Sequence, residues 1–457
     1  MKVSKYNFTF PLREDVYLIY NALSGAFAKV DSDILKLLAN MEKGKNIDTD
    51  DIEVFQMLDN LKEGKFAIPD DFDEIAFLKV VTNVKRFESR VLGLTITPTL
   101  ECNFACIYCY ENHMNVTMNT ETITALKDFL QRQTKDISGL GVAWFGGEPL
   151  LALNIMEDIS GCIFDLQKEE EFHYESGIVT NGYLLDKKKA EKLVELKITK
   201  VQITVDGPQG IHDVRRPLRN RKGTFKRIMK NLVDISDILK SISIWVSGGC
   251  VMDNVNISDI LKSISIRVNV DASNVDRVPE LFDILKSQGL KEKVGVYFSP
   301  VQIFSKVCRD ISPDCLSHEV FSKYEINLFK ITVEKGFKIW KYPRPLHGYC
   351  GAVNYNSLVV DPYGDFHKCW NTVGIKSEAV GTLGEPLEMN SLLTEWLSWD
   401  PFENEECRAC RFLPICMGGC PYLLRTKERN CDPWKYNLEE MLQLYYATKP
   451  KSEMPST

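Results

Sequence analysis

The sequence predicts an α/β protein built around a partial, TIM-like (β/α)6 barrel, with an α+β module before the barrel and a loop-rich domain after it. Three observations support this fold class. Strand-like and helix-like patterns alternate from Val91 to about Pro300, strands precede helices in the first 90 residues, and cysteine, glycine and proline become frequent from Gly348 onward. The 457 residues are enough for about three domains. We expect a module at 1–90, a barrel at 91–300, a helical connector at 301–347 and a C-terminal domain at 348–457.

The first 90 residues combine three short strand patterns with three helical ones. The strands are expected at Tyr6–Leu12, Val16–Leu23 and Ala26–Asp31, and the helices at Ser32–Met41, Asp51–Lys65 and Phe72–Phe87. Strands followed by three helices can form a small winged-helix-like module. The alternative is an N-terminal cap that belongs to the barrel.

The barrel is predicted from a βαβ series, which favours a parallel sheet with right-handed crossovers. Ligands of such folds bind at the C-terminal ends of the strands. The expected helices include Thr120–Lys135, Asp186–Leu196 and Thr224–Leu239. The expected strands are Leu92–Thr97, Val142–Phe145, Glu175–Thr180, Val201–Val205, Ile264–Val270 and Val294–Phe298.

One ten-residue sequence occurs twice. Ile235–Ile244 and Ile257–Ile266 both read ISDILKSISI, with an offset of 22 residues. A single extra copy does not make a repeat protein. We interpret it as a local duplication that lengthens one crossover and makes an excursion of Trp245–Asn256, which contains Cys250.

The composition restricts the partners and the compartment. The net charge of −7 argues against nucleic acid as the main partner. Met1–Phe10 lacks the apolar segment of a signal peptide, and no apolar run is long enough to span a bilayer. We therefore expect a cytoplasmic protein that binds neither membranes nor nucleic acid. In that reducing compartment, 14 cysteines indicate metal binding or catalysis rather than disulfides.

A basic run stands out locally. Its members are Arg215, Arg216, Arg219, Arg221 and Lys222. We expect a solvated loop, and the alternative is a contact for a carboxylate or an acidic peptide.

Three cysteines directly follow the first barrel strand. Cys102, Cys106 and Cys109 are spaced as CxxxCxxC, and three thiolates can hold three irons of a [4Fe–4S] cluster. The fourth iron then has no protein ligand and can bind a small molecule. The alternative is a zinc site that also uses His113, but zinc sites usually consist of paired CxxC knuckles.

This motif resembles that of the radical S-adenosylmethionine (SAM) superfamily, including the aromatic Tyr108 before the third cysteine. The resemblance implies that Gly146, Gly147 and Glu148, which follow the second strand with Pro149, bind the methionine end of SAM. Glycines allow close backbone approach, and a carboxylate suits an α-amino group. Without its position after a strand, such a segment would be only a turn.

Further segments at strand ends resemble those that line the SAM pocket. The resemblance implies SAM contacts for Thr180 and Asn181, which end the third strand. It implies the same for Asp206, after the fourth strand, and for Arg216. Each of these residues could instead simply form a turn.

Seven more cysteines resemble the SPASM domain, the C-terminal module of radical SAM enzymes that modify peptides and proteins. The resemblance implies two auxiliary [4Fe–4S] clusters, for a total of three. Cys350, Cys369 and Cys420 would hold the inner cluster, and Cys407, Cys410, Cys416 and Cys431 the outer one. The inner cluster would keep an open iron or use Cys308 or Cys315, which could equally be ordinary thiols. Cys162, on an apolar helix face, is expected in the core.

Peptide maturation is the function that this resemblance favours. A SAM-derived radical would abstract a hydrogen from a ribosomally made peptide, and the auxiliary clusters would accept an electron during crosslinking. The N-terminal module resembles the leader-peptide recognition domain of such maturases. A low-potential flavodoxin or ferredoxin would supply electrons.

Two alternatives stay open. Anaerobic sulfatase-maturating enzymes carry an Asp base immediately after the cysteine that matches Cys369, where this chain has Trp370, which cannot accept a proton. A non-catalytic iron–sulfur carrier or scaffold would need four ligands for each cluster, in contrast to the open iron predicted here.

Overall fold

The computed structural model describes residues 1–45, 51–111, 114–240, 264–302, 312–339, 341–425 and 430–449. Its main body is the predicted partial barrel, in which six parallel strands follow one another in chain order from β6 to β11. The strands are β6 (Val91–Ile96), β7 (Gly139–Trp144), β8 (His173–Thr180), β9 (Ile198–Thr204), β10 (Ile264–Val270) and β11 (Val294–Pro300). The predicted fold class is therefore confirmed.

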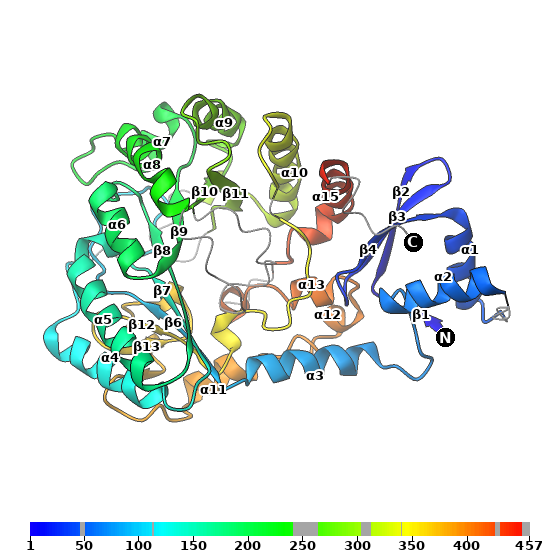
Figure 1. The fold of residues 1–457 in the computed structure, drawn as a ribbon, viewed down its shortest axis with the longest axis horizontal. Coiled ribbons are helices and arrows are strands. Elements are labelled where there is room, and N and C mark those ends of the chain that lie inside the picture. The colour runs from blue at the N-terminus through cyan, green and yellow to red at the C-terminus, as the bar shows by residue number, and fades with distance from the viewer. Residues whose placement is uncertain are drawn as a thin grey trace.

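Helices cover the outer side of this curved sheet (Figure 1). They are α4 (Thr120–Gln133), α5 (Leu153–Glu169), α6 (Lys187–Glu195), α7 (Gln209–Arg215), α8 (Phe225–Lys240) and α9 (Val278–Ser287). Strand β10 shows why the two faces differ: Ile264, Ile266 and Val268 are fully buried, whereas Ser265 and Arg267 between them are only half-buried. The apolar residues meet the helices, and the polar residues face the inside of the barrel.

The C-terminal part extends the barrel sheet, which the sequence did not predict. Strand β12 (Ser357–Val360) pairs in parallel with β6, with Leu358 opposite Leu94. Strands β13 (Asp365–His367) and β14 (Gly381–Thr382) then continue the sheet in antiparallel fashion. The remaining helices are α10 (His318–Glu334), α11 (Ser391–Ser398), α12 (Glu405–Ala409), α13 (Leu413–Cys416), α14 (Pro421–Arg425) and α15 (Trp434–Thr448).

The three strands and three helices predicted for residues 1–90 are present, with one addition. Strands β2 (Asn7–Arg13), β3 (Val16–Asn21) and β4 (Phe27–Asp31) make an antiparallel sheet. Helices α1 (Ser32–Glu42), α2 (Ile52–Glu63) and α3 (Glu74–Arg86) follow, each with an Asp that caps its first backbone N–H groups. The added feature is a short pair, β1 (Lys2–Val3) with β5 (Ala67–Ile68).

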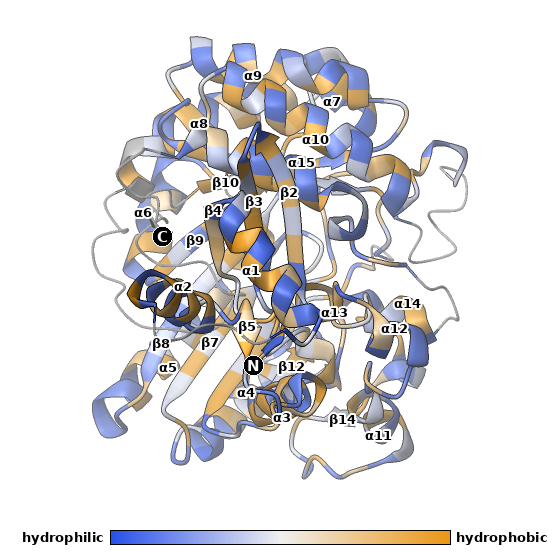
Figure 2. Cartoon of the chain, turned by 90° about the vertical axis from the view of Figure 1, so that its right-hand side faces the viewer, coloured by the Kyte–Doolittle hydropathy of each residue, from blue (hydrophilic) through white to orange (hydrophobic). Residues whose placement is uncertain are grey.

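Both faces of this sheet carry buried side chains. On one face, Ile19 and Val30 pack with α1 and α2, which present mixed apolar and polar residues in Figure 2. On the other face, the ring of Phe8 packs 4.8 Å from that of Phe412, between centroids. The Tyr20 hydroxyl donates a hydrogen bond of 3.0 Å to the carbonyl of Pro343. The module is therefore joined to the C-terminal part of the chain.

Several predicted features lie outside the described residues. They are His113, Cys250 and Cys308, and also Trp245–Asn256. The first copy of the duplicated sequence begins in α8, and the second ends in β10. No helix in the described ranges is long and apolar enough to cross a membrane.

Candidate active site

The loop after β6 brings three thiols together. Cys102 is buried, and its sulfur accepts a hydrogen bond of 3.4 Å from the backbone N–H of Phe104. Burial raises the pKa of Cys102 to about 12, and it also raises the pKa values of Cys106 and Cys109, which interact electrostatically with one another. Iron must therefore displace protons when it binds these thiols. Their convergence fits a cluster with three protein ligands.

The glycines after β7 lie against the start of the cysteine loop. A Cβ atom at Gly146 would lie 2.4 Å from the carbonyl oxygen of Thr99, and one at Gly147 would lie 2.3 Å from that of Glu101. Hydrogen bonds connect the same segments, from Gly147 N to Thr99 O and from Glu148 N to Glu101 O. The close approach that requires glycine here is therefore between two loops of the chain, whereas the sequence suggested a close approach to the ligand.

Glu148 is fully buried between β7 and β8. Its carboxylate accepts hydrogen bonds from Thr180 Oγ1 at 2.7 Å, from Asn181 N at 2.8 Å and from Leu150 N at 3.1 Å. The side chain of Asn181 in turn donates to Asn103 Oδ1 at 2.7 Å, beside the Cys102 sulfur at 3.9 Å. Glu148 thus fixes two strand ends to the cysteine loop. Its contact with the amino group of SAM stays a prediction.

A second network is centred on the hydroxyl of Tyr108. This hydroxyl donates to Asp206 Oδ2 at 2.5 Å, and it accepts from Arg216 Nη1 at 2.7 Å and from Asn269 Nδ2 at 3.0 Å. Burial raises the pKa of Tyr108 well above its ordinary value. Within the described residues, the buried Nε–H of Arg216 has no acceptor. An anionic group of SAM would supply one.

The expectation of a solvated basic run is wrong for its first two members. Arg215 is 2% exposed and Arg216 is 8% exposed. Arg215 donates to both carboxylate oxygens of Asp271 at 2.7–2.8 Å and to Asp206 at 3.3 Å. Arg215 can be buried because the carboxylates of Asp206 and Asp271 neutralise its guanidinium. The other three members, Arg219, Arg221 and Lys222, are exposed.

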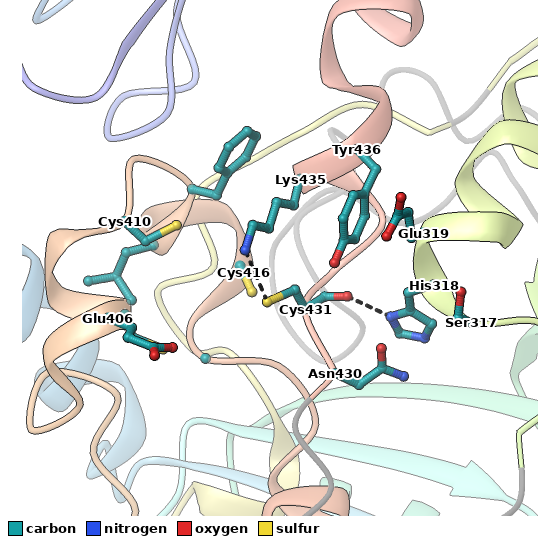
Figure 3. Close-up of a pocket in the computed structure, with 14 residues that line it drawn as sticks. Ser317, His318, Glu319, Glu406, Cys410, Cys416, Asn430, Cys431, Lys435 and Tyr436 are labelled. Atoms are coloured by element: carbon teal, nitrogen blue, oxygen red, sulfur yellow. Dashed lines mark hydrogen bonds between the residues drawn. The ribbon is translucent and has the colours of Figure 1, made fainter.

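The four cysteines assigned to the outer auxiliary cluster surround one cavity of about 390 Å³ (Figure 3). The cavity also contains side chains that the sequence did not single out. Lys435 Nζ lies 3.7 Å from the sulfur of Cys431, and a ring nitrogen of His318 lies 2.7 Å from the carbonyl oxygen of Cys431. The cysteines on its wall are Cys407, Cys410, Cys416 and Cys431.

The three cysteines assigned to the inner cluster also lie near one another. Burial raises the pKa of Cys369, and the neighbouring thiols of Cys350 and Cys420 contribute to the rise. Cys315 is half-buried. In the described ranges, no three His, Cys, Asp or Glu side chains converge closely enough to hold a single metal ion. Thiols that each bind a different iron of one cluster need not be that close together.

Three aromatic residues connect the loops of Cys109 and Gly146 with Cys369. Trp370, directly after Cys369, stacks on Phe145, directly before Gly146. The Tyr110 hydroxyl interacts electrostatically with the thiols of both Cys109 and Cys369. Cys162 packs half-buried against the core and is not part of these groups, as expected.

Part of the chain matches a known family. A model of the Radical SAM superfamily matches residues 96–266. The radical SAM cyclopropyl synthase TigE of Paramaledivibacter caminithermalis is 21% identical over 96% of this chain and 95% of its own. A cysteine-type anaerobic sulfatase-maturating enzyme of Clostridium perfringens is 23% identical over 74% of this chain and 90% of its own.

Two solved structures share the fold. The structure of anSMEcpe with bound AdoMet and Cp18Cys peptide has a TM-score of 0.57 at 20% identity, over 78% of this chain and 97% of its own. Streptococcus suis SuiB bound to the precursor peptide SuiA has a TM-score of 0.52 at 14% identity, over 94% of this chain and 98% of its own. At these identities the likeness is one of fold.

Proposed function

We propose that this chain, which carries a radical SAM domain over residues 96–266, is a maturase of a ribosomally made peptide. The modification is oxidative, and a crosslink is the form that we favour. One observation carries the proposal. The stack of Trp370 on Phe145 holds the loop of the auxiliary Cys369 against the loop that begins with Gly146. A substrate placed there would be near both the site of hydrogen abstraction and an electron acceptor.

Three [4Fe–4S] clusters and SAM are the proposed cofactors, with the ligand sets named from the sequence. When bound and reduced, the first cluster with SAM supplies a 5′-deoxyadenosyl radical that abstracts hydrogen. The residues of the chain position this chemistry. Glu148 fixes the Gly146–Gly147 segment, and Tyr108, Asp206 and Arg216 hold the cysteine loop against the ends of β9 and β10.

The N-terminal module is the proposed site for the leader of the precursor peptide. TigE and SuiB match 94–96% of this chain, whereas the anSMEcpe structure matches 78% and leaves about 100 of the 457 residues uncovered. The part of this chain that the anSMEcpe structure leaves uncovered is about the size of the module at residues 1–90. Among the described strands, β2 and β4 each pair only with β3, so each has an outer edge to which an extended peptide could add.

The same division into four segments is part of the proposal, with the barrel at 91–300 and the auxiliary-cluster domain at 348–457. A flavodoxin or a ferredoxin is the proposed electron donor.

The runner-up function is anaerobic sulfatase maturation, which the similarity to the C. perfringens enzyme supports. Against it stands Trp370, since its indole cannot take the role of the Asp base found after the matching cysteine in that family.

The experiment starts with the protein reconstituted anaerobically, reduced and supplied with SAM. Formation of 5′-deoxyadenosine separates an enzyme from an iron–sulfur carrier. The peptide encoded beside the gene is then added, and a product lighter by two hydrogen atoms supports crosslinking. Conversion of a sulfatase-derived cysteine peptide to formylglycine, with no change of the first peptide, would establish the runner-up. Cys102→Ala serves as the control that abolishes both.

A further inference from the structure

A positively charged side chain on the inner face of the barrel hydrogen-bonds to neutral partners among the described residues. Arg267 of β10 donates from Nε to Asn269 Oδ1 at 2.8 Å and from Nη2 to Ser299 Oγ at 2.9 Å. It also interacts electrostatically with the hydroxyl of Tyr297, which donates to Gln202 Oε1 at 2.6 Å. None of these partners carries a charge. In the part of the chain that the structure describes, no carboxylate lies within ion-pair distance of Arg267.

Arg215 provides the contrast within the same molecule. Its guanidinium is buried, but two carboxylates neutralise it, those of Asp206 and Asp271. A half-buried cation that lacks a counterion is costly unless a ligand supplies one. A guanidinium has five N–H donors in a planar fork that matches a carboxylate, and the bonds from Nε and Nη2 leave donors available for a ligand.

The position of Arg267 connects it with the proposed chemistry. Asn269, which accepts from Arg267, also donates to the Tyr108 hydroxyl, one residue before Cys109. The phenol of Tyr110 interacts electrostatically with Arg267 and with the thiols of Cys109 and Cys369. Arg267 therefore lies beside the space between the two sets of cluster ligands.

We propose that Arg267, oriented by Asn269 and Ser299, binds a carboxylate of the substrate peptide close to the residue that is modified. The substrate is then a peptide with an acidic residue near the reaction site. This inference rests on the proposed function and adds a substrate feature to it. The carboxylate of SAM has the same chemistry, but Arg216 is the better partner for it, because its guanidinium interacts with the Cys106 thiol and its Nε–H has no acceptor among the described residues.

The test compares Arg267→Gln with Arg267→Lys, which keeps the charge. The matched control is Arg277→Gln, which removes an exposed arginine paired with Glu280. SAM binding is followed by the change that SAM causes in the electron paramagnetic resonance spectrum of the reduced cluster. Peptide turnover is followed by mass spectrometry, with the peptide encoded beside the gene and with variants in which each Asp or Glu is replaced by Asn or Gln.

We expect Arg267→Gln to raise the KM for the peptide at least tenfold, with SAM affinity changed less than threefold, and Arg267→Lys to recover part of the loss. One peptide variant, in which the acidic residue bound by Arg267 is replaced, should show the same tenfold rise in KM with the unaltered enzyme. With Arg267→Gln, the KM for this variant should be less than twofold above the KM for the original peptide. A tenfold loss of SAM affinity would assign Arg267 to SAM and overturn the proposal. Equal processing of all peptide variants would also overturn it.

These outcomes are separate from failure of the proposed function. If only the inference is wrong, the unaltered enzyme still forms 5′-deoxyadenosine and still modifies the peptide. If the unaltered enzyme forms no deoxyadenosine, the proposed function fails and the inference fails with it. Iron content reports whether each variant folds, and Arg267→Lys carries the test if Arg267→Gln loses iron.

Discussion

The indole of Trp370 stacks on the ring of Phe145, with 5.2 Å between ring centroids and 23° between ring planes. Trp370 follows Cys369, Phe145 precedes Gly146, and the two residues are 225 positions apart in the chain. The indole is also 45% exposed, so part of it stays available to another molecule. This contact joins the proposed SAM loop to the proposed inner auxiliary site.

We predict that Trp370→Ala separates radical formation from peptide modification. Without the indole, the loop of Cys369 loses its contact with Phe145, so the peptide and its electron acceptor are no longer aligned. Peptide product should fall at least tenfold, while 5′-deoxyadenosine formation changes less than threefold. Trp370→Phe keeps an aromatic ring and should retain most product. Equal product from Trp370→Ala and the unaltered enzyme would contradict this role.

Glu148→Gln should weaken SAM binding without loss of iron. The two carboxylate oxygens accept from the fixed backbone donors Leu150 N and Asn181 N, and a glutamine amide would present a donor to one of them. The mismatch costs about 1–3 kcal/mol and shifts the loop. We expect an SAM dissociation constant at least tenfold higher. Glu169→Gln, on the exposed side of α5, is the matched control.

Iron content should follow the three proposed ligand sets. The unaltered protein should bind about 12 irons per chain, as three four-iron clusters require. Replacement of Cys407 and Cys410 by Ala should leave about 8 irons, with deoxyadenosine still formed. Cys162→Ala, outside all three sets, should change nothing. A double variant that keeps all its iron would remove the outer cluster from the proposal.

His212 should make the protein less stable in acid. Its ring is fully buried, its Nδ1 accepts from the backbone N–H of Asp206, and burial lowers its pKa to about 3. The unfolded chain takes up this proton near pH 6.5, whereas the folded chain does not, so stability falls as pH decreases from about 6.5 towards 3. The loss from this residue amounts to about 1.4 kcal/mol between pH 8 and pH 5.5.

Urea unfolding at both pH values measures this loss. His212→Asn keeps an acceptor for the Asp206 N–H but does not titrate in this range. The free energy of unfolding of the variant should therefore fall by about 1.4 kcal/mol less than that of the unaltered protein over the same interval. Parallel pH dependence of the two proteins would show that His212 is not the group responsible.

The order of the barrel strands could be predicted from the sequence because each strand is apolar and is followed by an amphipathic helix. The start of β7 was missed, since Gly139 and Gly141 give no strand signal and are placed by pairing with Val91 and Gly93. The strand β12 was missed for a similar reason. It has four residues, and its partner β6 lies more than 250 positions earlier in the chain.

The cysteines of the candidate site were recognised because their spacing is itself the signal. The groups that surround them carry no such signal. Asn269 and Asp271 belong to an ordinary strand end, and only the fold shows that they reach Tyr108 and Arg215. The burial of Arg215 could not be predicted either, because its bidentate partner Asp271 is 56 positions away in the sequence.

The pairing of β12 with β6 has a consequence for synthesis of the protein. At about 5–20 residues per second, a ribosome needs about 15–50 seconds after β6 to reach β12. During that time the parallel edge of β6 has no neighbour on one side, and exposed edges of this kind promote aggregation. The nascent barrel therefore keeps an open edge at β6 until β12 has been synthesised. Truncation before Ser357 would leave that edge permanently open.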